Sequence, residues 1–496
     1  MLIMKNNKNS HEPDMPLTGM QNGLTSINSE KARKHPASII ESSRWLLATL
    51  MLAVTFPVSL NAAVSEQEAR RLGKDLTPIG AEKSGNKEGT IPAWSGGIKE
   101  GEIPKAFKPG MHYPNPFPDD KPLFVIDKSN LDKHRDKLTD GQLALFKTYP
   151  DTFKMPVYKT RRTARQPERI YYNTQAAATK AELLDGGNGF KGAYDAYPFP
   201  IPQNGLEAIW NHIVRYRGEY VVRRASEVAV QRSGAYSLVT SQQEALLNYN
   251  LPGGSEQSLD NTIFYYLSFT RSPARLAGGA VLIYETLNQI KQPRQAWGYN
   301  AGQRRVRRAP NLSYDTPIAA SDGLRTADDT DIYNGAPDRY NWVLKGKKEI
   351  YIPYHNYELV SPKLKYKDIL TQGHVNPEHT RYELHRVWVV EGQLKPGSRH
   401  VYSKRVLYLD EDSWGAAVLD QYDSRGNLWR VSMAYLINYY DRPTVWTGLD
   451  VFHDLQARRY HVQGLANEEL SYIDFERAIP PKNYFKPSTL RRRGRR

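Results

Sequence analysis

Apolar and polar residues alternate through most of the second half of the chain, and this pattern predicts a series of β-strands. Alternation is expected where every second side chain of a strand faces a core. The predicted strands cover residues 220–230, 235–247, 262–270, 280–287, 297–299, 304–308, 382–390, 401–409, 416–422 and 428–439. Because short connections join antiparallel neighbours, the pattern favours a meander that forms a barrel or a strongly curved sheet.

Four short helices are predicted before these strands. Each has a capping residue or a glycine stop at its end. They begin after Ser65, after Thr139 or Asp140 (142–146), at Thr174 (175–184) and after Asn204 (206–216). In the last helix, apolar residues recur at the spacing of one helical face. Mainly β structure with flanking helices is therefore the expected fold class.

Residues 64–135 are rich in glycine and proline, which argues against regular elements there. The same segment carries Trp94, Phe107, Tyr113 and Phe117, so we expect it to wrap around the sheet in an ordered way. A second irregular stretch, 311–340, interrupts the strands. A long insertion of this kind is a natural cap over the concave face of a curved sheet.

The N-terminal region predicts export from the cytoplasm. Residues 45–60 carry no charge, follow Arg44 and precede small residues around Ala62, which is the pattern of a secretory signal. The stretch is shorter than the roughly 20 residues of a membrane-spanning helix. We expect cleavage near Ala62 and a periplasmic location, with an uncleaved anchor as the alternative. Because the polar part before it is long, Met15 or Met20 is an alternative start.

These features divide the chain into four parts. We predict a signal peptide with a long polar start at 1–62, a Gly/Pro-rich extension with short helices at 63–203, a half-barrel domain at 204–480 and a basic tail at 481–496. The tail contributes five arginines to a net charge of +15. The remaining positive charge suits a solvated surface or contact with anionic lipid head groups, while no basic helix indicates nucleic-acid binding.

The chain contains no cysteine. Disulfides, iron–sulfur clusters, thiolate zinc sites, cysteine nucleophiles and lipid attachment at a signal-peptide boundary are therefore excluded. The mature protein is expected to be soluble. Tyrosine outnumbers phenylalanine, 32 to 13, and its amphipathic ring can line a groove.

Three patterns were weighed as catalytic or ligand sites. The glycine spacing at 187–192 matches a dinucleotide motif, but it follows a predicted helix and precedes no helix, so the required context is missing. His379, Glu383 and His385 could share one strand face with Arg381 and hold a metal, or form an ordinary solvated face. Asp322, Asp328, Asp329 and Asp331 could bind calcium but lack the EF-hand spacing, and turn chemistry is the favoured interpretation.

Asp410 and Asp412 fall in a predicted turn, where aspartate is common for backbone reasons. No catalytic or metal site and no cofactor is therefore predicted. The aromatic strands are more informative, because the apolar runs 264–269 and 387–390 indicate strands covered on both faces. One face is then core and the other is either core or a ligand cavity. The predicted ligand-contacting residues are Phe264, Phe269, Trp297, Trp388 and Trp429.

Several sequence blocks resemble a known family of exported proteobacterial proteins. They include 76–82, 89–94, 198–202, 204–212, 303–310, 333–340 and 347–354. By these blocks the chain resembles domain of unknown function 1329, which is similar to the LolA/LolB carriers of outer-membrane lipoproteins. The resemblance implies a half-barrel of antiparallel strands around an apolar cavity and no enzymatic activity. It also implies work beside an RND-type exporter and an outer-membrane protein.

The leading hypothesis is a periplasmic, monomeric carrier or adaptor that binds a lipid or another hydrophobic molecule. A hydrolase acting on a hydrophobic substrate is the alternative, and it requires a buried histidine or carboxylate beside a nucleophile in a pocket. A structural adaptor between an exporter and the outer membrane is compatible with the carrier.

Overall fold

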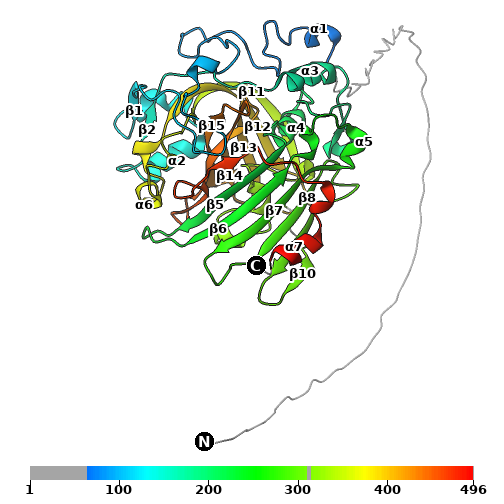
Figure 1. Ribbon diagram of the computed structural model, residues 1–496. Coiled ribbons are helices and arrows are strands. Elements are labelled where there is room, and N and C mark those ends of the chain that lie inside the picture. The colour runs from blue at the N-terminus through cyan, green and yellow to red at the C-terminus, as the bar shows by residue number, and fades with distance from the viewer. Residues whose placement is uncertain (1–63, 310–313, 495–496) are drawn as a thin grey trace, which may run out of the picture. The chain divides into compact units, whose positions relative to one another are not determined.

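The computed structural model describes residues 64–309 and 314–494, and one large curved sheet organises them (Figure 1). Sixteen of the described strands belong to this sheet. The first half in chain order consists of β1 (Phe124–Ile126), β2 (Met155–Val157), β5 (Tyr220–Val230), β6 (Leu238–Leu246), β7 (Thr262–Ser272), β8 (Ala280–Thr286), β9 (Gln295–Asn300) and β10 (Arg305–Arg308). The second consists of β11 (Tyr340–Pro353), β12 (Tyr382–Leu394), β13 (Lys404–Asp410), β14 (Ala416–Tyr422), β15 (Leu428–Tyr439), β16 (Thr444–Asp454), β17 (Arg459–Leu465) and β18 (Ile473–Asp474).

Two antiparallel meanders are joined edge to edge in this sheet. Strands β5 to β10 pair in sequence order, and so do β12 to β17. The last strand of the second meander, β17, then pairs with β5, the first strand of the other. Strand β11 pairs with β12, β18 pairs with β5, and the only parallel contact of the described sheet joins β12 to β2. The expected curved antiparallel sheet is confirmed, and it remains open.

The helices are short and pack on different parts of this sheet. Those of the described chain are α1 (Glu66–Ala69), α2 (Asp140–Thr148), α3 (Glu168–Ala177), α4 (Gly205–Val214), α5 (Glu256–Leu259), α6 (Tyr366–Ile369) and α7 (Pro487–Arg493). Helix α4 packs against β11 and β12, α2 against β14 and β15, and α7 against β8, β9 and β10. Helix α4 is buried along almost its whole length because Trp210 and Ile209 enter the main core.

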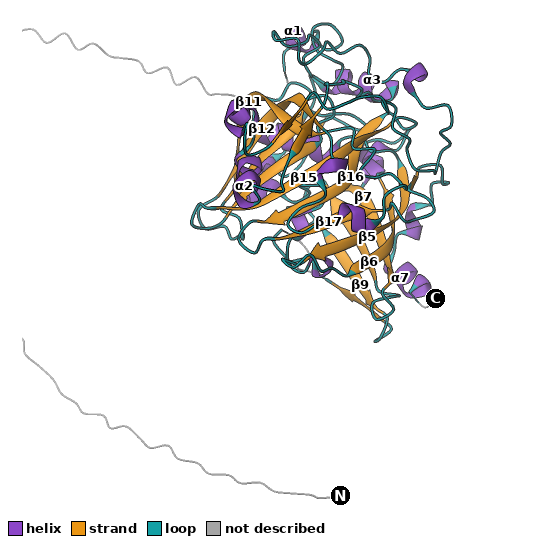
Figure 2. Ribbon diagram, turned by 90° about the vertical axis from the view of Figure 1, so that its left-hand side faces the viewer, coloured by secondary structure: helices purple, strands orange, loops and turns teal. Residues whose placement is uncertain are grey.

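Residues 64–203 pack against the sheet instead of forming a flexible linker, as expected. Ile91, Ile98, Tyr113 and Phe117 are buried although they lie in irregular segments. Figure 2 shows α1 and α3 of this extension at one end of the strands, whereas α2 lies along another side of the sheet. The extension also holds a small separate hairpin of β3 (Glu182–Leu183) and β4 (Phe190–Lys191). The described residues, 64–309 and 314–494, belong to one compact unit, and the predicted boundary near residue 204 stays a prediction.

The strands that were predicted agree well with the structure, whereas the position of one predicted helix is wrong. β5, β14 and β15 have the predicted bounds, but β11, β16 and β17 were not predicted. The helix expected at 175–184 instead covers Glu168–Ala177, with Pro167 at its N-cap position and the acidic Glu168 in its first turn. The Thr174 hydroxyl accepts a hydrogen bond from the Tyr197 N–H (3.0 Å) and so caps nothing.

The predicted signal peptide and its cleavage near Ala62 lie outside the described residues. Among the residues that the structure describes, no helix has the length and apolar character needed to cross a membrane.

Candidate functional site

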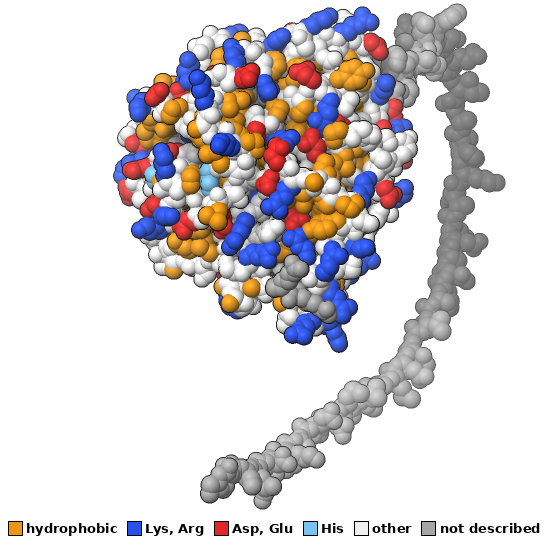
Figure 3. All heavy atoms as spheres, in the orientation of Figure 1, with side chains coloured by type: hydrophobic (Ala, Val, Ile, Leu, Met, Phe, Trp, Pro, Cys, Tyr) orange, Lys and Arg blue, Asp and Glu red, His pale blue; other side chains and the backbone are white. Residues whose placement is uncertain are grey.

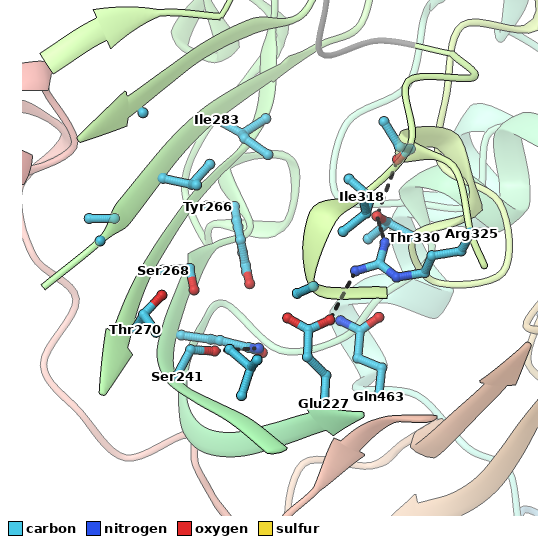
Figure 4. A pocket seen from close by; sticks show the side chains of 18 of the residues that line it. Glu227, Ser241, Tyr266, Ser268, Thr270, Ile283, Ile318, Arg325, Thr330 and Gln463 are labelled. Atoms are coloured by element: carbon cyan, nitrogen blue, oxygen red, sulfur yellow. Dashed lines mark hydrogen bonds and ion pairs between the residues drawn. The ribbon is translucent and has the colours of Figure 1, made fainter. Parts of the chain in front are cut away.

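A cavity of about 1180 Å³ lies on the concave face of β5 to β9, under the segment 317–334 (Figure 4). Its volume is slightly above the usual range for small-molecule sites, roughly 300–1,000 Å³. One wall is the sheet, and the other is the described part of the predicted cap. The predicted insertion therefore does cover a concave face of the sheet.

The sheet wall is built by strand alternation. On β7, Phe264, Tyr266, Ser268 and Thr270 face the cavity, as do Val239, Ser241, Gln243 and Ala245 on β6. Because successive side chains of a strand point to opposite faces, the intervening residues belong to another layer. Leu267 and Phe269 are buried there with Phe485 and Leu490 of the C-terminal segment. The wall is thus mainly apolar with small hydroxyl groups between.

Ion pairs hold the cap against the sheet. Arg325 of the cap reaches Glu227 of β5 (3.5 Å), and Asp331 accepts a hydrogen bond from Arg215 (2.6 Å). On the other side, Glu285 of β8 pairs with Arg294 (2.6 Å), whose guanidinium also donates to the Asn334 carbonyl. These contacts bring together segments that are far apart in the sequence. They fix the position of the cap over the cavity.

Polar groups gather where β5, β17 and β16 meet the cavity. Glu227, Gln463 and Asp450 are direct neighbours across these strands and all line the space. Burial raises the pKa of Asp450 to about 7, helped by the negative charge of Asp331. Burial also acts on Glu227, but the hydrogen bond of His461 and the charge of Arg325 bring its pKa below the usual value. One end of the cavity is therefore polar.

The cavity meets solvent at exposed lining residues. These are Ala235, Ser237, Arg275, Leu276, Asn300, Arg305, Arg307, Pro317 and Asp322. Figure 3 shows Lys and Arg side chains gathered at the end of the molecule where β10 and α7 lie. The charged residues of the entrance are thus mainly positive, while the interior is mainly apolar.

Only Phe264 of the five predicted ligand-contacting residues lines this cavity. Phe269 lies on the opposite face of β7 under Arg493, whose guanidinium carbon is 4.4 Å from the ring centroid. Trp297 packs with Tyr284 on that same face. Trp388 stacks on Trp414, and the indole N–H of Trp429 donates to Asp454 (3.0 Å). Phe264 and Phe269 are separated by an odd number of positions along β7, and such a spacing places two side chains of one strand on opposite faces.

Most of the lining residues are not among the five predicted from the sequence. Tyr266 lies two positions from Phe264 on the same strand, so the alternation of side chains predicts that both face the cavity. Ile283 is directly opposite Tyr266 on β8 and therefore lies on the same face. Asp450 and Gln463 lie on strands that were not predicted. No sequence pattern signalled them.

The expectation that Arg381, Glu383 and His385 form a solvated strand face is wrong. All three are buried, and Glu383 accepts hydrogen bonds from Arg381 (2.7 Å) and His355 (2.7 Å). Burial favours neutral His385, but its contacts with Asp410 and Glu383 raise its pKa to about 9. The face is buried because the N-terminal extension covers it. His379 lies in a short helical turn before β12.

Asp412 lies in the predicted turn and Asp410 ends β13 just before it, and both side chains are buried in the same network. With His385 they place possible metal ligands within 4.8 Å of one another. The Arg162 guanidinium donates two hydrogen bonds to Asp412 (2.8 and 2.6 Å), however, and so occupies the place of a cation. The arrangement is an ion-pair network that fastens residues 82–163 to the sheet.

The acidic group of the cap is also paired. Asp328 accepts a hydrogen bond from the Thr326 hydroxyl (2.6 Å), in line with the favoured turn chemistry, and it also binds His400 (3.0 Å) and Arg405 (2.9 Å). Asp329 keeps some local turn chemistry, since it accepts from the Thr326 N–H (2.8 Å). Asp322 is exposed and pairs with Arg459.

The glycine motif at 187–192 serves packing. It lies around the turn between β3 and β4, where Gly187 has a positive φ of 74°. The Gly187 carbonyl accepts a hydrogen bond from the Trp210 indole (2.8 Å), and a Cβ there would meet Leu206 at 2.4 Å. Glycine is needed for this close approach to α4.

Fold and site together define a mainly β protein in which an open, curved antiparallel sheet and a cap enclose an amphipathic cavity. The chain belongs to the family described as Protein of unknown function (DUF1329), whose model matches residues 125–491. The predicted family resemblance is therefore confirmed.

One relative and two solved structures are similar to this chain. An uncharacterized protein of Pseudomonas aeruginosa is 49% identical over 458 residues, which is 92% of this chain and 100% of that protein. One structure is a putative outer membrane lipoprotein-sorting protein domain from Vibrio parahaemolyticus. It is 14% identical in sequence with a TM-score of 0.40, and the match covers 58% of this chain and 98% of that domain. A LolA superfamily protein from Nitrosomonas europaea has 13% identity, a TM-score of 0.34 and coverage of 57% and 97%.

Proposed function

We propose that this protein is a non-enzymatic periplasmic carrier that binds a lipid or another hydrophobic molecule under the cap. The observation that carries the proposal is the cavity of about 1180 Å³ with its apolar sheet wall. Each methylene transferred from water into such a space contributes about 0.8 kcal/mol. A long hydrocarbon chain can therefore bind without specific polar contacts along most of its length.

Phe264, Tyr266 and Ile283 are the proposed contacts for the apolar part of the ligand, since they face the cavity from β7 and β8. All three are only partly buried by protein, so a ligand would cover them further. Trp388, Trp429, Trp297 and Phe269 are not part of this proposal, because none of them lines the cavity.

The periplasmic location and the partners rest on the sequence. The predicted signal peptide supports export, and the family resemblance supports work beside an RND-type exporter and an outer-membrane protein. In-cell crosslinking from the positive entrance, for example from position 305, should capture an envelope protein. Capture of cytoplasmic proteins alone would contradict the location.

Filling the cavity tests the proposed function. Ser268→Trp adds a large ring to the cavity face of β7 and should weaken binding of the fluorescent apolar probe N-phenyl-1-naphthylamine at least tenfold. Ser424→Trp, in the exposed turn between β14 and β15, is the matched control and should leave binding unchanged. Equal binding by both variants would contradict a ligand site under the cap. Hydrolysis of p-nitrophenyl esters by the wild-type protein that Ser268→Trp abolishes would favour the alternative hydrolase.

A further inference from the structure

Unpaired hydrogen-bond acceptors mark the polar end of the cavity. Asp450 is 4% exposed and Gln463 is 8% exposed. Within the described chain, Asp450 Oδ1 and Gln463 Oε1 have no hydrogen-bond partner, although both residues line the cavity. A buried polar group without a partner costs about 1–3 kcal/mol. These atoms therefore have a physical reason to bind a ligand group.

The sheet places the acceptors in one row. Asp450 of β16 is directly opposite Gln463 of β17, which is directly opposite Glu227 of β5. Side chains of directly opposite residues lie on the same face, with Cβ atoms about 4.5–5.5 Å apart. Figure 4 shows Gln463 and Glu227 side by side, below Arg325 of the cap. The row is thus held by three paired strands.

The two other carboxylates beside Asp450, those of Glu227 and Asp331, are already paired. Glu227 is compensated by Arg325, and Asp331 by Arg215 and Arg217. Arg223 lies over the Trp446 ring and donates to Gln243 (2.7 Å). An anionic head would face the oxygens of Asp450 and Gln463, and a cationic head would meet the arginines. A neutral group that donates a hydrogen bond avoids both conflicts.

We propose that the row Asp450, Gln463 and Glu227 recognises the neutral, hydrogen-bond-donating head of an amphiphile, most simply a hydroxyl group, whose hydrocarbon part extends along β6 to β8. This inference rests on the proposed function and specifies its ligand class. A hydroxyl both donates and accepts, so it also fits the Gln463 amide in either orientation.

Four probes with the same sixteen-carbon chain test the head-group preference on wild-type protein. They are 1-hexadecanol, hexadecyl methyl ether, hexadecyl phosphate and hexadecylammonium, each used to displace N-phenyl-1-naphthylamine. The alcohol should bind at least tenfold tighter than each of the other three. Equal affinities, or a preference for the phosphate or ammonium, would overturn the inference while leaving the carrier intact. Failure of the fluorescent probe itself to bind would contradict the proposed function instead.

Two variants test whether Asp450 and Gln463 cause the preference for the alcohol head group. Asp450→Asn exchanges one acceptor for a donor with little change in shape, and Gln463→Met removes the amide at similar length. Each should reduce the advantage of the alcohol over the ether to less than threefold while the fluorescent probe still binds. Asp420→Asn is the matched control, because Asp420 is a buried carboxyl of β14 that does not line the cavity. A full advantage in both Asp450→Asn and Gln463→Met would overturn the assignment.

Discussion

At the residue scale, buried charged side chains attach the N-terminal extension to the sheet. Arg162 contacts Asp412 and Glu411, and it also donates to the Glu82 carbonyl (2.7 Å). Lys347 of β11 joins Glu411 (2.8 Å) and Glu82 (3.1 Å). Such a network contributes mainly when it is complete, because a charge left alone in the interior is costly.

Replacing Arg162 should therefore destabilise the protein strongly. Arg162→Met leaves Asp412 and Glu411 without this guanidinium and is expected to cost about 3–5 kcal/mol in the free energy of unfolding. Arg135→Met removes an exposed pair with Asp132 and is expected to cost less than about 1 kcal/mol. Urea unfolding followed by tryptophan fluorescence measures both. Equal losses in the two variants would show that the buried network is unimportant.

A buried carboxyl of β14 predicts how stability depends on pH. Burial raises the pKa of Asp420 to about 7, and neighbouring Asp140 adds to this effect. The folded protein therefore binds this proton more tightly than the unfolded chain does, whose aspartate pKa is about 3.9. The contribution of Asp420 to the free energy of unfolding therefore decreases as the pH rises between these two pKa values, and above both of them it is lost completely.

Asp420→Asn removes this dependence. The stability of the variant relative to wild type should increase by about 2–4 kcal/mol between pH 4 and pH 8. The direction follows because only wild type must ionise a buried group at the higher pH. Thermal unfolding at both pH values measures the difference in Tm. A difference in Tm that does not change with pH would contradict the raised pKa.

At the element scale, α4 depends on its N-cap. Asn204 accepts a hydrogen bond from the Glu207 N–H (3.1 Å) and donates to the Glu207 carboxyl (2.7 Å). Asn204→Ala should cost about 1–2 kcal/mol, because Glu207 is fully buried and loses a donor. Ser65→Ala, at the cap of the exposed four-residue helix α1, should cost less. Denaturant midpoints compare the two, and a larger loss at Ser65 would contradict this assignment.

The sequence predicted those helices and strands whose formation depends mainly on nearby residues. Strand β5 alternates regularly, and the caps at Thr139 and Asn204 lie where expected. Strand β11 was missed because Lys345, Lys347 and Lys348 obscure its pattern and a bulge shifts its register at Gly346. The register between β17 and β5 depends on residues more than 220 positions apart. Such a pairing leaves no local signal.

At the scale of the whole molecule, the sequence predicted a curved sheet with a cap but not which face encloses the cavity. The period of two separates Phe264 from Phe269 without telling which of them faces the concave side. Burial by other segments decides this: Phe485 and Leu490 of the C-terminal segment cover one face, and residues 317–334 cover the other. The polar row at Asp450 arises only where the two meanders meet.

The composition of the bound material tests the carrier most directly. Protein purified without detergent from the cell envelope is extracted with organic solvent, and the extract is analysed by mass spectrometry beside that of Ser268→Trp. We expect an amphiphile in about equimolar amount with the wild-type protein, strongly reduced in Ser268→Trp and retained in Ser424→Trp. Wild-type protein that is consistently empty, or equal extracts from Ser268→Trp and wild type, would contradict a hydrophobic ligand under the cap.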